Sequence, residues 1–103
     1  MAGRMRIRAR TKGDVTEVKA LMSHPMETGQ RRDSSGEKVP AHYIKEVTAK
    51  HNDKTVLSAN WGPAVSQNPF LKFSFKGGAP GDKVSVSWSD NKGESQSEEV
   101  TLK

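Results

Sequence analysis

The chain has 103 residues, with 17 Lys and Arg against 12 Asp and Glu, so its formal net charge is +5. This length predicts a single domain over residues 1–103. The sequence contains no cysteine, which excludes disulfides, thiolate metal sites, iron–sulfur clusters and a cysteine nucleophile.

Seven short segments alternate apolar with polar residues, which is the pattern of strands with one buried face. In chain order they are Met5–Arg10, Val15–Ser23, Ala41–His51, Thr55–Trp61, Phe70–Phe75, Lys83–Ser89 and Ser95–Leu102. No segment sustains the apolar spacing of an amphipathic helix over three turns. The sequence therefore predicts an all-β fold, an immunoglobulin-like antiparallel β-sandwich of about seven strands.

The predicted core is small, because Leu, Ile, Val and Phe together account for only 18 of the 103 residues. In the alternating pattern, Leu21, Ile44 and Phe70 also fall on the face opposite their apolar neighbours. A strand with apolar residues on both faces needs a cover on both, and a partner subunit is one such cover. Scattered surface hydrophobes are an equally supported alternative. With a partner, we expect a marginally stable isolated chain that gains stability on binding.

Two predicted connections are longer than a hairpin needs, residues 24–40 and residues 62–69. Connections beyond about 12–15 residues in a compact domain are usually functional or disordered. The first begins with varied side chains from His24 to Arg31 and continues into a polar turn over residues 32–38. Its first half is therefore a candidate binding segment.

The three histidines, His24, His42 and His51, are the candidate metal ligands. His42 and Glu46 are four residues apart, which on a strand places them about 13 Å from each other, too far to share one ion. His24 and His42 could meet only through the long connection. The sequence therefore predicts surface or loop histidines and no metal site.

Motifs for catalysis are missing from the sequence. No serine lies in a Gly-x-Ser-x-Gly elbow, and the adjacent carboxylates Glu98 and Glu99 point to opposite faces of a strand. The glycine-rich segment 77–81 lacks the Lys-Ser/Thr of a phosphate-binding loop. We therefore expect no catalytic residues, no cofactor and no enzymatic activity.

A sequence pI near 9.7 raises nucleic acid as a partner, but the distribution of charge argues against it. The basic residues lie in the segment from Arg4 to Lys12, at Arg31 and Arg32, and singly elsewhere, without interleaved aromatic residues. A solvated basic surface is the favoured interpretation. The sequence also lacks the ~20-residue apolar stretch of a membrane helix and the apolar core of a signal peptide, so we expect no membrane contact.

One short segment, Ala41–Lys45, resembles the superoxide reductase family, which is also immunoglobulin-like. The iron site of that family requires four histidines and one cysteine, and this chain has three histidines and no cysteine. The resemblance therefore supports the fold and speaks against the activity. A redox metalloprotein of this type is kept as the alternative function.

A second resemblance covers nearly the whole chain. Three segments closely resemble the SoxZ family: Ser23–Arg31, Pro63–Phe75 with its Pro-Ala-Val-Ser-x-Asn-Pro start, and Val84–Gly93 with its Asp-x-x-Gly turn. The resemblance implies an immunoglobulin-like subunit that pairs with SoxY in the SoxYZ sulfur carrier of thiosulfate oxidation. SoxY carries the sulfur intermediates on a cysteine in its glycine-rich C-terminal arm.

The resemblance also implies that the subunit catalyses nothing, and that pathway enzymes dock transiently on the heterodimer. It implies a periplasmic location without a signal peptide on this chain, reached by co-export with SoxY. In such a heterodimer we expect Met26 to be the apolar anchor and Glu27 and Arg31 to make charged contacts. The candidate partner-binding residues are His24, Pro25, Met26, Glu27, Arg31, Ile44 and Phe70.

Overall fold

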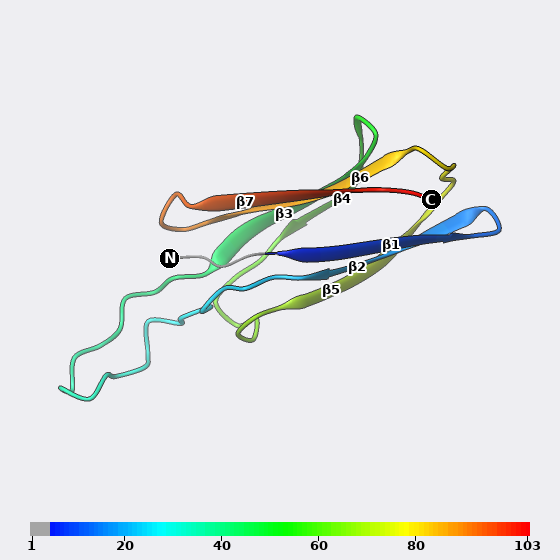
Figure 1. Ribbon diagram of the computed structural model, residues 1–103. Coiled ribbons are helices and arrows are strands. Elements are labelled where there is room, and N and C mark those ends of the chain that lie inside the picture. Colours follow the sequence, from blue (N-terminus) through cyan, green and yellow to red (C-terminus); the bar gives the residue numbers. More distant parts are fainter. Residues whose placement is uncertain (1–4) are drawn as a thin grey trace.

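The computed structural model describes residues 5–103 as seven strands in two layers (Figure 1). Arg4, the first residue of the basic N-terminal segment, lies outside the described residues. The strands are β1 (Arg6–Lys12), β2 (Val15–Leu21), β3 (Ile44–His51), β4 (Lys54–Asn60), β5 (Phe70–Lys76), β6 (Lys83–Asp90) and β7 (Ser95–Thr101). Over the described residues, no helix is long and apolar enough to cross a membrane.

The two layers are a three-stranded sheet in the order β1-β2-β5 and a four-stranded sheet in the order β4-β3-β6-β7. Every neighbouring pair of strands is antiparallel. Consecutive strands form hairpins within each sheet, and the chain changes sheet after β2, after β4 and after β5. This arrangement confirms the predicted β-sandwich, and each strand begins and ends within three residues of its predicted bounds.

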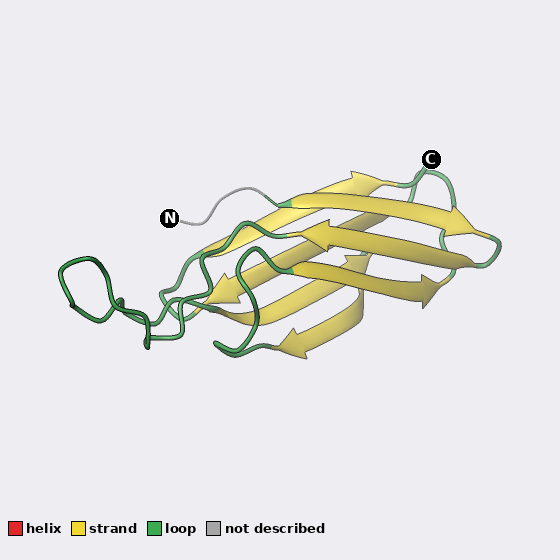
Figure 2. Cartoon of the chain, turned by 90° about the horizontal axis from the view of Figure 1, so that it is seen from below, coloured by secondary structure: helices red, strands yellow, loops and turns green. Residues whose placement is uncertain are grey.

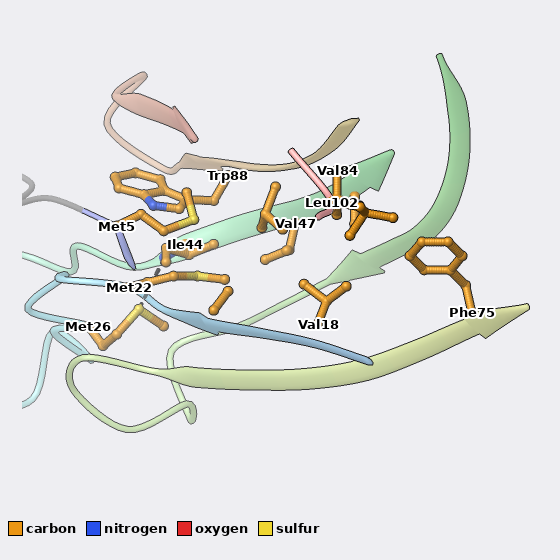
Figure 3. Close-up of a cluster of buried hydrophobic side chains, with 13 residues drawn as sticks. Met5, Val18, Met22, Met26, Ile44, Val47, Phe75, Val84, Trp88 and Leu102 are labelled. Carbon is orange, nitrogen blue, oxygen red and sulfur yellow. Dashed lines mark hydrogen bonds between the residues drawn. The ribbon is translucent and has the colours of Figure 1, made fainter. Parts of the chain in front are cut away.

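The core lies between the inner faces of the two sheets (Figure 3). At the end nearest the long connection it contains three methionines, Met5, Met22 and Met26, and Met5 lies beside Trp88 (Figure 3). Unbranched methionines fill irregular space, which suits the point where a loop replaces regular strands. The other buried apolar residues are Val18, Ala20, Ile44, Val47, Ala49, Phe75, Val84, Val86 and Leu102.

The prediction that Ile44 faces outward is wrong, because its side chain is completely buried. The alternation fails at the start of β3, where the pairing with β6 shifts register between Ile44 and Glu46. One extra residue on β3 is accommodated there, so Ile44 and Val47 point to the same face although three positions separate them. A bulge of this kind leaves no signal in the hydrophobic pattern.

Leu21 and Phe70 do face outward, as predicted, with exposed fractions of 44% and 60%. The two residues are directly opposite each other in the β2–β5 pair, so they form one apolar patch on the outer face of the three-stranded sheet. Val15, at the other end of β2, is also exposed.

The connection between β2 and β3 extends from one end of the sandwich as an irregular arm (Figures 1 and 2). Its two branches are paired through the bridges Glu27–His42 and Arg32–Lys38. The molecule is consequently elongated, with a long axis of 53 Å and two short axes of 19 Å. The arm is therefore an ordered structure and not a flexible linker.

Gly78→Ala is expected to destabilise the protein more than Gly77→Ala. Both glycines have positive φ, 112° and 102°, so alanine at either site incurs about 1–3 kcal/mol of backbone strain. At Gly78 the added Cβ would also clash with the buried Thr16 hydroxyl, whereas at Gly77 it would meet open space. Urea unfolding of the two variants measures the difference, and equal losses of stability would contradict this packing.

Candidate functional site: a surface arm anchored on a buried histidine–aspartate cluster

A buried cluster of His24, His42 and Asp90 joins the arm to the sandwich. His24 Nε2 lies 3.0 Å and His42 Nε2 lies 2.8 Å from the same Asp90 oxygen, Oδ2. The two imidazole centroids are 4.5 Å apart, and Trp88 packs edge-on against His24 at 5.0 Å. His24 and His42 lie at the two ends of the arm, where it leaves β2 and where it enters β3, and Asp90 is the last residue of β6. The cluster therefore ties three distant parts of the chain together.

The hydrogen bonds of the cluster assign the proton on His24. The Met26 backbone N–H donates to His24 Nδ1 at 3.0 Å, so Nδ1 is the acceptor and Nε2 carries the proton that it donates to Asp90. His42 Nε2 also lies 2.9 Å from a carboxylate oxygen of Glu94. Both imidazoles therefore act as donors to carboxylates.

The Asp90 carboxylate is saturated with donors. Its Oδ2 receives the two imidazoles, and its Oδ1 receives the backbone N–H groups of Lys92 and Glu94 at 3.0 and 2.8 Å. Burial would by itself raise the pKa of Asp90 and is the largest single influence. The bonds from His24, the Glu94 N–H, His42 and the Lys92 N–H together outweigh it and lower the pKa to about 2. Asp90 is therefore held as a carboxylate.

Burial lowers the pKa of His24, because desolvation opposes the imidazolium; the bond to Asp90 acts in the opposite direction, and His42 again lowers it. The side chain of His24 is fully buried and that of His42 is 9% exposed. These two histidines therefore lie in the long connection, as predicted for loop histidines, but they are buried and not at the surface. The arm brings them together through the one route that sequence reasoning had left open. His51, from the end of β3, instead pairs with Asp82 at 2.8 Å.

Two histidines and an aspartate are residue types that bind metal ions, and here their possible ligand atoms lie within 4.8 Å of one another. Its hydrogen bonds do not suit one. A metal on His24 Nε2 would displace the ring proton to Nδ1, where it would face the Met26 N–H donor. Binding would therefore require the first turn of the arm to break. This geometry gives the superoxide reductase alternative no support.

The first turn of the arm is strained and locked by the cluster. Met26 has a φ of 47°, a left-handed conformation that is costly for a residue other than glycine or asparagine. Its backbone N–H binds His24 Nδ1, and its sulfur accepts the Ile44 N–H at 3.4 Å. Met26 is only 5% exposed, so in the isolated chain its side chain is buried and is not presented to a partner as the predicted apolar anchor. It positions the arm instead.

Beyond this turn the arm presents charged groups. Arg31 binds the Glu27 carboxylate through Nε at 2.9 and 2.8 Å and through Nη2, and this pairing lowers the pKa of Glu27. Gly29 has a φ of 88°, and its Cα lies against Ala41, where an added Cβ would come within 3.3 Å of the Ala41 Cβ. The close approach of the two branches of the arm therefore favours glycine at this position.

The second long connection, residues 62–69, lies beside the root of the arm. The His24 N–H binds the Asn68 side chain and the Asn68 N–H binds the His24 carbonyl, both at 3.0 Å. Phe70 follows this connection directly, so the exposed Leu21–Phe70 patch sits at the arm end of the sandwich. Of the seven predicted partner-binding residues, His24, Met26 and Ile44 lie inside, while Pro25, Glu27, Arg31 and Phe70 reach the surface to different degrees.

Sequence reasoning missed Asp90, which it took only as the first residue of a turn. The signal was present, because an aspartate that opens an Asp-x-x-Gly turn commonly accepts backbone N–H groups two to four residues later. What the sequence could not show was that its second oxygen faces two histidines far away along the chain.

The fold and this site define an immunoglobulin-like β-sandwich domain that displays a rigidly anchored surface arm. The family model for the sulphur oxidation protein SoxZ matches residues 5–101. The chain therefore belongs to the SoxZ family, and this membership implies a role in sulfur oxidation. Among curated proteins, none matches the sequence significantly.

Acidification is expected to destabilise the fold through Asp90. Its pKa is lowered from 3.8 to about 2 in the folded state, so its stabilising contribution is present above 3.8 and is lost as the pH falls from there toward 2. The difference corresponds to roughly 2 kcal/mol. Asp90→Asn is expected to lose roughly 2–3 kcal/mol at neutral pH and to flatten the stability profile between pH 4 and pH 2.

Urea unfolding at a series of pH values measures both effects. Asp53→Asn is the matched control, because it removes one carboxylate from an exposed turn and leaves the buried cluster intact. If the profile of Asp90→Asn paralleled that of the unmodified protein between pH 4 and pH 2, the anchoring role of Asp90 would be refuted.

Proposed function

We propose that this chain is the non-catalytic subunit of the SoxYZ sulfur carrier, pairing with and supporting SoxY in periplasmic oxidation of thiosulfate and other sulfur compounds. The observation that carries the proposal is membership of the SoxZ family in a chain without cysteine. A covalent sulfur carrier needs a thiol, so the carrying group must belong to a partner. The cysteine arm of SoxY supplies that group.

The absence of cysteine also suits a subunit that lies beside a carrier arm. A thiolate attacks disulfides and related sulfur–sulfur bonds by exchange. A second thiol near the carrier cysteine would therefore divert the carried sulfur from that cysteine. The supporting subunit avoids this side reaction because it has no thiol.

The arm end of the sandwich is the surface that best fits the permanent contact with SoxY. It joins an exposed aromatic residue, Phe70, to Leu21 and to the Glu27–Arg31 pair at the surface of the arm. Stable interfaces place such apolar anchors at the centre and charged groups at the rim. The buried members of the predicted set, among them Met26 and Ile44, then hold the arm in shape.

A periplasmic location is part of this proposal. The resemblance of the chain to the SoxZ family implies export bound to SoxY, whose twin-arginine signal serves both subunits. The pairing must then occur before export, in the folded state. Fractionation of cells that express this chain with and without SoxY tests this part separately.

Mixing the purified chain with SoxY is expected to give one heterodimer peak in size-exclusion chromatography and a higher melting temperature than the isolated chain. Phe70→Ala is expected to weaken the pairing roughly 10- to 100-fold, because it removes an exposed aromatic anchor. Val15→Ala, at the far end of β2, is the matched control and should bind like the unmodified chain. Separate peaks for the two unmodified proteins would end the proposal.

A further inference from the structure

The outer face of the three-stranded sheet carries seven of the 17 Lys and Arg residues of the chain and few acidic residues. Strand alternation directs the cations of β1, β2 and β5 to this side, away from the core. The cations of this basic face are Arg6, Arg8, Arg10, Lys12, Lys19, Lys72 and Lys76. Glu17 is the acidic residue among them.

The charge of this face exceeds that of the whole chain. Seven cations and one carboxylate give the basic face a net charge of +6, which leaves −1 for the remaining residues of the +5 chain. Glu17 lies 3.7 Å from Lys19 and 3.5 Å from Lys72, so one carboxylate is shared by two lysines. The neighbouring edge strand β7 carries Glu98 and Glu99, and Glu99 lies 3.7 Å from Lys83.

Part of this arrangement works against folding. In the register of the sheet, Arg8 is directly opposite Lys19, and Lys19 is directly opposite Lys72. Like charges directly opposite each other destabilise a sheet. Three cations in one row across three strands therefore cost stability in the isolated chain, and the single carboxylate of Glu17 offsets only part of this repulsion.

We propose that the basic face is a docking surface for an acidic protein surface, presented by an enzyme that acts on the carrier heterodimer. The inference rests on the proposed function, because that function supplies enzymes that must find the carrier in turn. A surface with a large excess of cations attracts an acidic partner over a distance near the Debye length, about 10 Å at 0.1 M salt, and raises the rate of encounter. The contact is transient.

The basic face stays accessible when the heterodimer forms. Permanent interfaces are depleted of lysine at their centres, since burying unpaired charges carries a large desolvation cost. The arm end, with Leu21 and Phe70, offers an apolar surface without that cost. The two surfaces meet at Arg6, which is directly opposite Leu21 in the sheet. One molecule can therefore bind SoxY at its arm end and an enzyme along the rest of the sheet.

The face fits a protein better than a nucleic acid. It is the outer face of a three-stranded sheet, and within residues 5–103 it carries no helix that could enter a groove to read bases. The carboxylate of Glu17 lies among its cations and would repel phosphates. The exposed aromatic residue of this sheet, Phe70, lies in the patch assigned above to SoxY, so in the heterodimer it offers no stacking surface for bases.

The test reverses charge on the face within the assembled heterodimer. Arg8→Glu with Lys72→Glu reverses two cations of the central row, and Lys50→Glu with Lys54→Glu makes the same change in charge on the other sheet. Both double variants are first mixed with SoxY and checked by size-exclusion chromatography. Each purified enzyme that modifies the carrier arm is then assayed with the heterodimers as substrates at 20 to 500 mM NaCl.

The basic-face variant is expected to form the heterodimer and to lower kcat/KM for at least one of these enzymes roughly tenfold at the lowest salt concentration. The loss should disappear at the highest salt concentration, while the Lys50–Lys54 variant should behave like the unmodified heterodimer. Both substitutions place a carboxylate opposite Lys19, which offsets the loss of the Lys72–Glu17 ion pair, so the melting temperature of the basic-face variant should not fall. Lost turnover would then reflect lost docking rather than misfolding.

Several outcomes would overturn the inference. Equal kcat/KM values for the two double variants at every salt concentration would show that the face docks no enzyme. Loss of the heterodimer in the basic-face variant alone would make the face the SoxY interface. Salt-dependent binding of a 20-base-pair duplex DNA to the unmodified heterodimer, abolished by Arg8→Glu and Lys72→Glu, would make nucleic acid the partner. Failure of the unmodified proteins to pair would appear in the chromatography first, and would refute the proposed function itself.

Discussion

The buried carboxylate of Asp90 is the interaction on which the special features of this sandwich depend. An isolated charge in a protein interior is costly, and it is tolerated here because both of its oxygens are filled with donors. Two of these donors are imidazoles at the two roots of the arm, and two are N–H groups of the β6–β7 turn. The same contacts that neutralise the cost of the charge therefore fix where the arm begins and ends.

The consequence for function is rigidity at a surface that would otherwise be mobile. A connection of this length would ordinarily lose much conformational entropy on binding. Here the strained turn at Met26 and the bridge between Glu27 and His42 order the arm before any partner arrives. In the proposed heterodimer, SoxY then meets a preformed surface. In that proposal the chemistry stays on SoxY, and this chain contributes shape and charge.

The outer face of the three-stranded sheet is itself divided by chemistry. Its arm end carries exposed apolar residues beside the charged pair of the arm, whereas the rest of the face carries the cations. Permanent and transient contacts make different physical demands, since the first gains from apolar burial and the second from long-range attraction. One small domain can meet both demands because an antiparallel sandwich exposes its outer faces to solvent.

The sequence by itself determined the strands, the sandwich and the exposure of Leu21 and Phe70, because strand alternation is a local property that needs no knowledge of the fold. The absence of a thiol and the basic strands were equally plain in the sequence. The tertiary structure alone decided that Ile44 and His24 are buried. A bulge shifts the phase of the first, and the second depends on an aspartate 66 residues further along the chain. Such contacts between distant residues leave no periodic signal, so only the folded chain reveals them.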